Sequence, residues 1–135
     1  MRFGSFPIAP AAVAALATGF IISVGGCKKS AEEALVTPPK STGEAATQLE
    51  QVFEQATIEV KQTVNNVSTA MRGGDYERAV VSLVVVRDSG KLTPDQGIAV
   101  HNSMVTMEMS LIRAMESGDP KAKKAYEMLK RLKRN

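Results

Sequence analysis

Apolar residues after position 43 recur every three or four positions, which is the spacing of one face of an amphipathic α-helix. The first and longest stripe predicts a single helix from Glu44 to the pair Gly73-Gly74, where glycine favours helix termination. The apolar positions of this stripe are Ala45, Leu49, Val52, Phe53, Ala56, Val60, Val64, Val67 and Met71. Its acidic residues gather in the N-terminal half, where carboxylates interact favourably with the helix dipole.

The next segment contains a valine-rich run, Val80–Val86, that suits either a buried strand or a buried helix. No second strand-like run is present to pair with it, and a lone strand leaves its backbone groups unsatisfied. The run is therefore interpreted as a helix buried among other helices, with the strand as the alternative. Asp75 is the expected N-cap of this helix and Gly90 its expected stop.

The stretch Thr93-Pro94-Asp95-Gln96 predicts a third helix, because Thr, Pro and Gln stand at the positions of a capping box with proline in the first turn. This helix should run to about Ser117 and stop at Gly118. It carries two adjacent apolar stripes, one formed by Ile98, Val105, Met109 and Ile112 and the other by Val100, Met104, Met107 and Leu111. Its methionines are expected mainly in the core, the alternative being an adaptable binding face.

Asp119-Pro120 repeats the cap-then-proline pattern and predicts a last helix. The apolar face of this helix consists of Ala122, Ala125, Tyr126, Leu129 and Leu132. The junction Ala70–Asp75 has an echo 44 residues later at Ala114–Asp119, with Ala-Met, glycine and aspartate at matching places. This echo predicts two helical hairpins, each with a tight turn.

Together these segments predict an all-α fold, a small bundle of three to four helices over residues 44–135. The stretch Gly74–Ala79, GDYERA, resembles the turn and second-helix start of a tetratricopeptide repeat. That resemblance covers only half a repeat and implies packing in helical hairpins. The chain has no room for the three repeats that a peptide-binding array needs.

Composition limits the type of core and the type of partner. The chain has 135 residues, of which 44% are hydrophobic and 4% aromatic, with no tryptophan. The core must therefore be built mainly from aliphatic side chains and methionine, which offer little surface for stacking bases or sugars. A net charge of +3 is too small to indicate a polyanionic partner, and no nucleic-acid partner is expected.

Residues 1–26 have the layout of a secretory signal peptide. Arg2 supplies a positive charge, an apolar segment follows at Ala11–Val24, and small residues precede Cys27. The apolar segment is short for a membrane-spanning helix, which needs about 20 residues. The alternative is an uncleaved membrane anchor that starts near Pro7.

The sequence Val24-Gly25-Gly26-Cys27 resembles the lipobox of bacterial lipoprotein precursors. The resemblance implies cleavage between Gly26 and Cys27, and lipidation of Cys27 with acyl chains such as palmitate. It also implies export and attachment to a bacterial membrane by lipid, and Lys28 in place of aspartate favours the outer membrane. A buried structural cysteine is the alternative, and a disulfide within the chain is excluded because no second cysteine exists.

Residues 27–43 are expected to form the lipidated N-terminus and a flexible linker, because Pro38-Pro39 and several Ser, Thr and Gly residues disfavour a packed element. A flexible chain of this length reaches about 20–25 Å, so the domain would stand just off the bilayer.

The sequence indicates no catalytic, cofactor or metal site. His101 is the only histidine and is expected to be half-buried in packing, and no motif of a nucleophile, a phosphate loop or a metal site is present. The C-terminal segment is strongly basic: seven cations against two acids give +5 over residues 119–135, whereas six against ten give −4 over residues 41–118. The possible contacts with an anionic surface are Lys121, Lys123, Lys124, Lys130, Arg131, Lys133 and Arg134.

These features predict a membrane-anchored bacterial lipoprotein with a small, non-enzymatic helical domain for interaction or scaffolding. Two alternatives belong to other classes. One is an accessory or inhibitor subunit of an envelope enzyme or transport complex, and the other is a structural envelope protein that self-associates through its long first helix.

Overall fold

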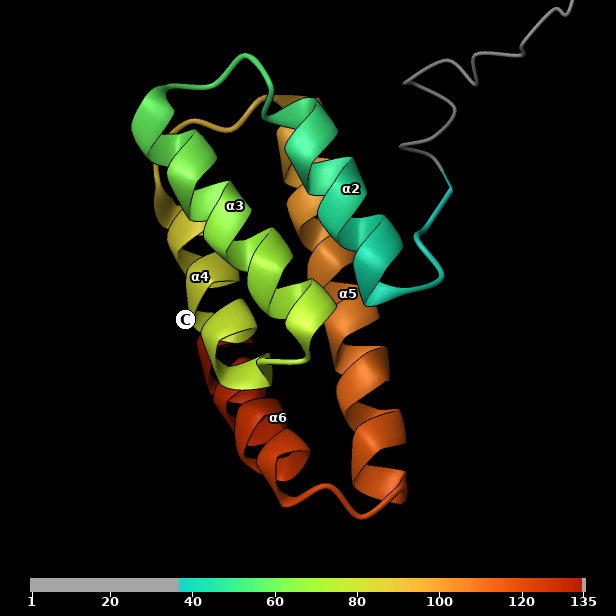
Figure 1. Ribbon diagram of the computed structural model, residues 1–135. Coiled ribbons are helices and arrows are strands. Elements are labelled where there is room, and N and C mark those ends of the chain that lie inside the picture. Colours follow the sequence, from blue (N-terminus) through green and yellow to red (C-terminus); the bar gives the residue numbers. More distant parts are fainter. Residues whose placement is uncertain (1–36, 135) are drawn as a thin grey trace, which may run out of the picture.

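The computed structural model describes residues 37–134. Its helices are α2 (Thr42–Val52), α3 (Ile58–Gly73), α4 (Tyr76–Asp88), α5 (Pro94–Glu116) and α6 (Pro120–Lys133) (Figure 1). This described part contains no strand, which confirms the all-α prediction. The predicted signal peptide, its cleavage at Gly26 and the lipidation of Cys27 lie outside the described residues.

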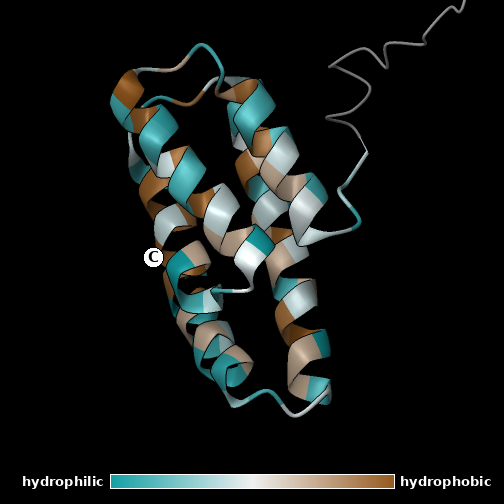
Figure 2. Ribbon diagram, in the orientation of Figure 1, coloured by the Kyte–Doolittle hydropathy of each residue, from teal (hydrophilic) through white to brown (hydrophobic). Residues whose placement is uncertain are grey.

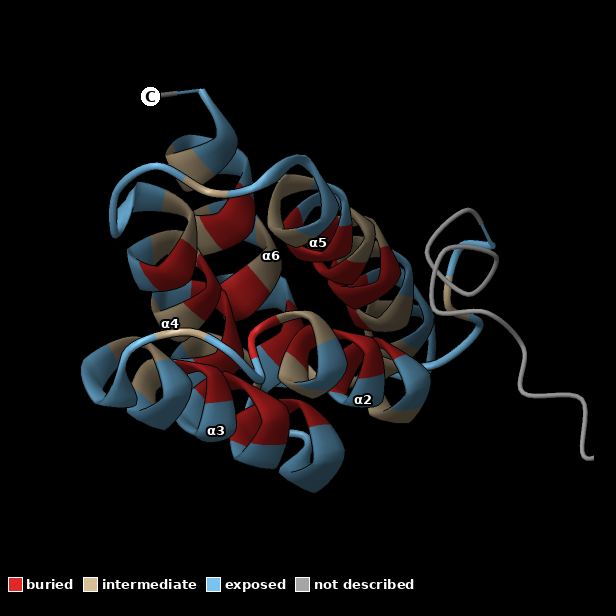
Figure 3. Cartoon of the chain, turned by 90° about the horizontal axis from the view of Figure 1, so that it is seen from above, coloured by how far each residue is buried: buried red, intermediate tan, exposed pale blue. Residues whose placement is uncertain are grey.

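The helices form an up-and-down bundle in which α3 and α5 run opposite to α2, α4 and α6 (Figure 1). Helix α2 packs on α3 and α5, while α4 contacts α3, α5 and α6. Both predicted hairpins are present, α3 with α4 and α5 with α6. Seen from above, buried residues line the inward sides of all five helices (Figure 3).

Aliphatic residues, methionine and alanine build the core, as the composition predicted. The largest fully buried hydrophobic side chains are Phe53, Leu49, Leu83, Met107, Leu111 and Leu129. Alanines on every helix are also buried, and their small side chains let the helix backbones approach closely. Hydrophilic and hydrophobic segments alternate along α3, as expected of an amphipathic helix (Figure 2).

The prediction of a single long helix from Glu44 to Gly73 is wrong, because the chain folds back between Val52 and Ile58. Phe53 follows α2 directly and turns into the core, and Thr57 stands as the N-cap of α3. The apolar spacing continues through this turn, so the pattern along the chain looks unbroken. Folding back brings the apolar faces of α2 and α3 into contact with each other and with the same core, which a straight helix would prevent. The bundle therefore has five helices in the described part rather than three to four.

The valine-rich run is helical throughout, which confirms the preferred interpretation of Val80–Val86. Val80, Leu83 and Val86 are fully buried, whereas Val81 and Val85 are exposed. Spacings of three separate the buried positions, as a helix requires.

The predicted caps and turns are present. The Thr93 hydroxyl accepts a hydrogen bond from the Gln96 backbone N–H, and the Gln96 side chain accepts one from the Thr93 N–H. The two echoing junctions share one geometry: Asp75 N–H donates to Ala70 O, and Asp119 N–H donates to Ala114 O, both at 2.9 Å. A glycine with positive φ precedes each aspartate, which is the usual backbone of such a helix end.

Side-chain bonds connect α3 to α2 at two places. The buried Ser68 hydroxyl donates to Ala46 O at 3.3 Å. The Arg72 guanidinium donates two hydrogen bonds of 2.7 Å to the Glu50 carboxylate. These hydrogen bonds from Arg72 hold the pKa of Glu50 below its usual value, and the Ser68 hydroxyl adds to the effect.

A Glu50→Gln variant is expected to lose stability at neutral pH and to match the unchanged protein in acid. Because the folded-state pKa of Glu50 is lowered, its stabilising contribution is present above the unfolded pKa and is lost as pH falls through the folded pKa. The pair is partly exposed, so the difference should be below about 1 kcal/mol. Urea unfolding at neutral pH and at about pH 3 measures it. A stability difference independent of pH would contradict this role for the Glu50 charge.

Candidate functional site

The segment before α2 is bonded to the bundle at Pro39. The Thr106 hydroxyl, on the middle of α5, donates a hydrogen bond of 3.1 Å to the backbone oxygen of Pro39. The expected linker, residues 27–43, is therefore fixed from Pro39 onward, and α2 begins at Thr42 rather than near Glu44. The residues from Pro39 to Gly43 are therefore not part of the flexible linker that the sequence had suggested.

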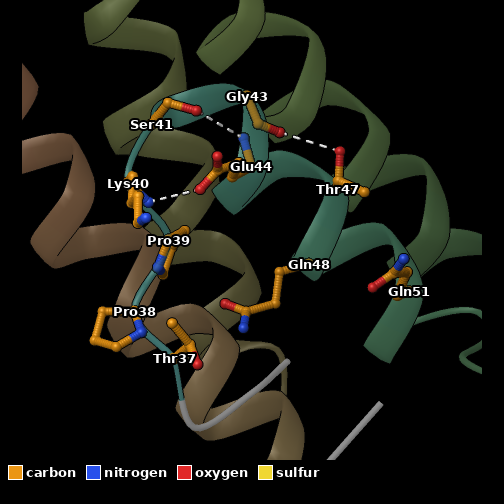
Figure 4. Close-up of a pocket in the computed structure, with 10 residues that line it drawn as sticks. All are labelled: Thr37, Pro38, Pro39, Lys40, Ser41, Gly43, Glu44, Thr47, Gln48 and Gln51. Atoms are coloured by element: carbon orange, nitrogen blue, oxygen red, sulfur yellow. Dashed lines mark hydrogen bonds between the residues drawn. The ribbon is translucent and has the colours of Figure 1, made fainter. Parts of the chain in front are cut away.

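Ser41 caps α2, which the sequence reasoning missed. Its hydroxyl accepts a hydrogen bond from the Glu44 backbone N–H at 3.1 Å, and the Glu44 carboxylate accepts one from the Lys40 backbone N–H at 2.8 Å (Figure 4). The signal was present, because Ser41-Thr42-Gly43-Glu44 has the spacing of a capping box.

A hollow of about 550 Å³ lies between this segment and α2 (Figure 4). Most of the residues that line it are of polar types: Thr37, Pro38, Pro39, Lys40, Ser41, Gly43, Glu44, Thr47, Gln48 and Gln51. The only carboxylate in it, that of Glu44, is engaged in capping α2. This carboxylate is therefore not free to act as a general base on a hydroxyl of the lining.

Metal ligands do not cluster in the part of the chain that the structure describes. His101 is exposed on α5, so the expectation that it is half-buried in packing is wrong. Within residues 37–134, no helix is long and apolar enough to cross a bilayer.

The seven cations at the C-terminal end are all exposed, but they do not form one free basic face. Lys124 binds Glu77 on α4 at 2.8 Å, and Lys133 binds Glu108 on α5 at 2.6 Å. These two bonds point to opposite sides of α6 and fix it between its two neighbours. Lys121 lines a shallow hollow beside the α3–α4 turn.

The cations available to a partner are therefore fewer than the sequence suggested. Lys130 has only a 3.8 Å contact with Glu127 and lies over the Tyr126 ring at 5.4 Å. Lys121, Lys123, Arg131 and Arg134 complete the set of exposed cations that are not bonded to another helix. Lys130 lies one turn before Lys133, so it occupies the side of α6 that is turned to α5.

The outer face of α5 is the largest departure from the predicted core. Of its two predicted stripes, the one with Val100, Met104, Met107 and Leu111 is buried. The other stripe faces solvent. In it the side chain of Ile98 is 45% exposed, that of Met109 49% and that of Ile112 37%, while Val105 is half-buried. The expectation that the methionines lie mainly in the core holds for Met104 and Met107, and fails for Met109.

No family model, curated protein or solved structure matches the chain.

Proposed function

We propose that this chain is the precursor of a bacterial lipoprotein and that its helical domain is a non-enzymatic interaction or scaffold module in the cell envelope. The observation that carries the proposal is the lipobox-like Val24–Cys27 at the end of an apolar leader. Acyl chains on Cys27 would anchor the mature N-terminus, since two or more chains are needed for stable attachment.

The geometry of the domain supports such an anchor. Its first helix has its own cap at Ser41, and the chain before it is bonded to α5 at Pro39. In the part of the chain that the structure describes, the helices of the bundle therefore form their core without the residues before Pro39. The linker can attach the domain to a membrane without taking part in that core. The outer membrane is the favoured location, from Lys28 after the cysteine.

An interaction role suits the surfaces of the described residues better than catalysis does. Exposed apolar and basic residues are present on α5 and α6, and such residues suit contact with a partner. Self-association through a long first helix loses its basis, because that helix is divided into α2 and α3.

A Cys27→Ala variant is expected to leave the membrane fraction or to accumulate as the full-length precursor, because the sulfur that would carry lipid is gone. Fractionation of cells and intact mass of the protein measure both outcomes. Ser30→Ala, three residues away, is the matched control and should remain anchored and processed. Unchanged attachment and processing of the Cys27→Ala variant would contradict the proposal.

A further inference from the structure

We propose that the outer face of α5 rests on the surface of the membrane that holds the lipid anchor, with the adjoining basic side of α6 contacting anionic headgroups. This inference depends on the proposed function, because the anchor at Cys27 is what brings the domain to the bilayer. The lipid surface is the proposed partner of an apolar stripe on the outer face of α5. This stripe, called the α5 stripe, consists of Ile98, Val105, Met109 and Ile112.

The α5 stripe has the character of an interfacial helix face. Its members are spaced seven, four and three residues apart and so share one side of α5, opposite the buried stripe. Between Ile98 and Ile112 the one acidic residue is Glu108, and its carboxylate is bound by Lys133. Asp95 and Glu116 lie one turn beyond the two ends of the stripe. The stretch from Ile98 to Ile112 can therefore enter the headgroup region of a bilayer without burying an unpaired carboxylate.

The linker reaches the bundle beside this stripe. At 100° per residue, Thr106 lies on one border of the α5 stripe and Glu108 on the other. Thr106 donates a hydrogen bond to the backbone oxygen of Pro39, so the described chain before α2 meets α5 at the first border. Twelve residues separate Cys27 from Pro39, which gives a reach of about 17–21 Å. The anchor therefore keeps this side of the bundle close to the bilayer.

Cations flank the other border. Helix α6 lies on the side of α5 away from α2, and Lys133 bonds it to Glu108 (Figure 3). Lys130 occupies the same side of α6 as Lys133. Around the axis of α6, Lys123 and Arg134 are each about a quarter turn away from Lys133. Lysine and arginine at the edge of an apolar face suit anionic headgroups, whose attraction adds to the apolar contact.

A lipid surface fits the α5 stripe better than a second copy of the chain. A stable protein interface buries about 800 Å² on each partner, and four side chains, three of them only 37–49% exposed, fall well short of that area. A contact made by a tethered domain needs far less buried area, because a short flexible linker gives an effective concentration in the millimolar range. At an effective concentration of about 1 mM, a membrane contact with a dissociation constant of about 1 mM would already be occupied about half of the time.

The test uses the full lipidated protein in vesicles of phosphatidylethanolamine and phosphatidylglycerol. A single cysteine is introduced as Met109→Cys on the α5 stripe or, as the matched control, as Val85→Cys on α4, where the native side chain is 50% exposed. Each is labelled with an environment-sensitive fluorophore, and quenching by nitroxide-labelled lipids is measured. We expect quenching at position 109 to exceed that at position 85 by at least about twofold, and to fall when phosphatidylglycerol is omitted.

Equal quenching at the two positions would overturn the proposal. So would a label at position 109 that is shielded from water, escapes the lipid quencher and becomes exposed on dilution of the protein, because a second copy would then cover the stripe. Failure of the anchor itself is detected separately. Cys27 is the only native cysteine, so the unsubstituted protein takes no thiol label when Cys27 is lipidated and takes label when it is free.

Discussion

Replacing Phe53 with alanine is expected to lower the free energy of unfolding by about 3–5 kcal/mol, the usual result of deleting a buried aromatic ring. Phe53 is 1% exposed and is the one phenylalanine in the core of the described residues. It sits where the chain leaves α2, and its backbone N–H donates to Leu49 O at 3.1 Å. Loss of the ring would leave a cavity in the core between α2 and α3, and the surrounding helices can only partly close it.

Urea unfolding followed by circular dichroism measures this loss. Ile58→Ala is the matched control, because Ile58 lies at the start of α3 and is 70% exposed. Its substitution should change stability by no more than about 0.5 kcal/mol. If the two variants were equally stable, Phe53 would not be the residue that closes the turn between α2 and α3.

Leu83→Ala is expected to destabilise the protein by about 2–5 kcal/mol, whereas Val85→Ala should change stability by no more than about 0.5 kcal/mol. Leu83 is fully buried and Val85 lies on the outside of α4. Residues two apart point to opposite sides of a helix but to the same face of a strand. The pair therefore tests both the burial of α4 and its secondary structure in one experiment.

Chemical denaturation of both variants, with circular dichroism of each folded state, provides the measurement. Losses of similar size at positions 83 and 85 would indicate that both side chains share a buried face. That outcome would contradict the helix and restore the strand alternative for Val80–Val86.

Helix ends were the most predictable feature of this chain, because a cap depends on residues within one turn of each other. Thr93 and Gln96 satisfy each other through their own backbone and side-chain groups, so four residues of sequence carry the whole signal. The same is true of the two junctions that end in glycine and aspartate. Ser41 and Glu44 had an equally local signal that went unused.

The candidate interaction surface was only partly predictable. The cations of α6 could be named from the sequence, but their partners could not, since Glu77 and Glu108 lie far away along the chain. Lys124 and Lys133 are bonded to neighbouring helices, which leaves Lys121, Lys123, Lys130, Arg131 and Arg134 as the more available set. The bond from Thr106 to Pro39, 67 residues apart, had no sequence signal at all.

By itself, the sequence determined that the chain is helical, where most of its helices start and stop, and which side chains are apolar, because each of these depends on neighbours within a turn or two. Only the tertiary structure decided that the first stripe folds back at Phe53 and that one of the two stripes of α5 stays in contact with solvent. The physical reason is that periodicity shows which side of a helix is apolar, whereas burial depends on which other helices pack against that side.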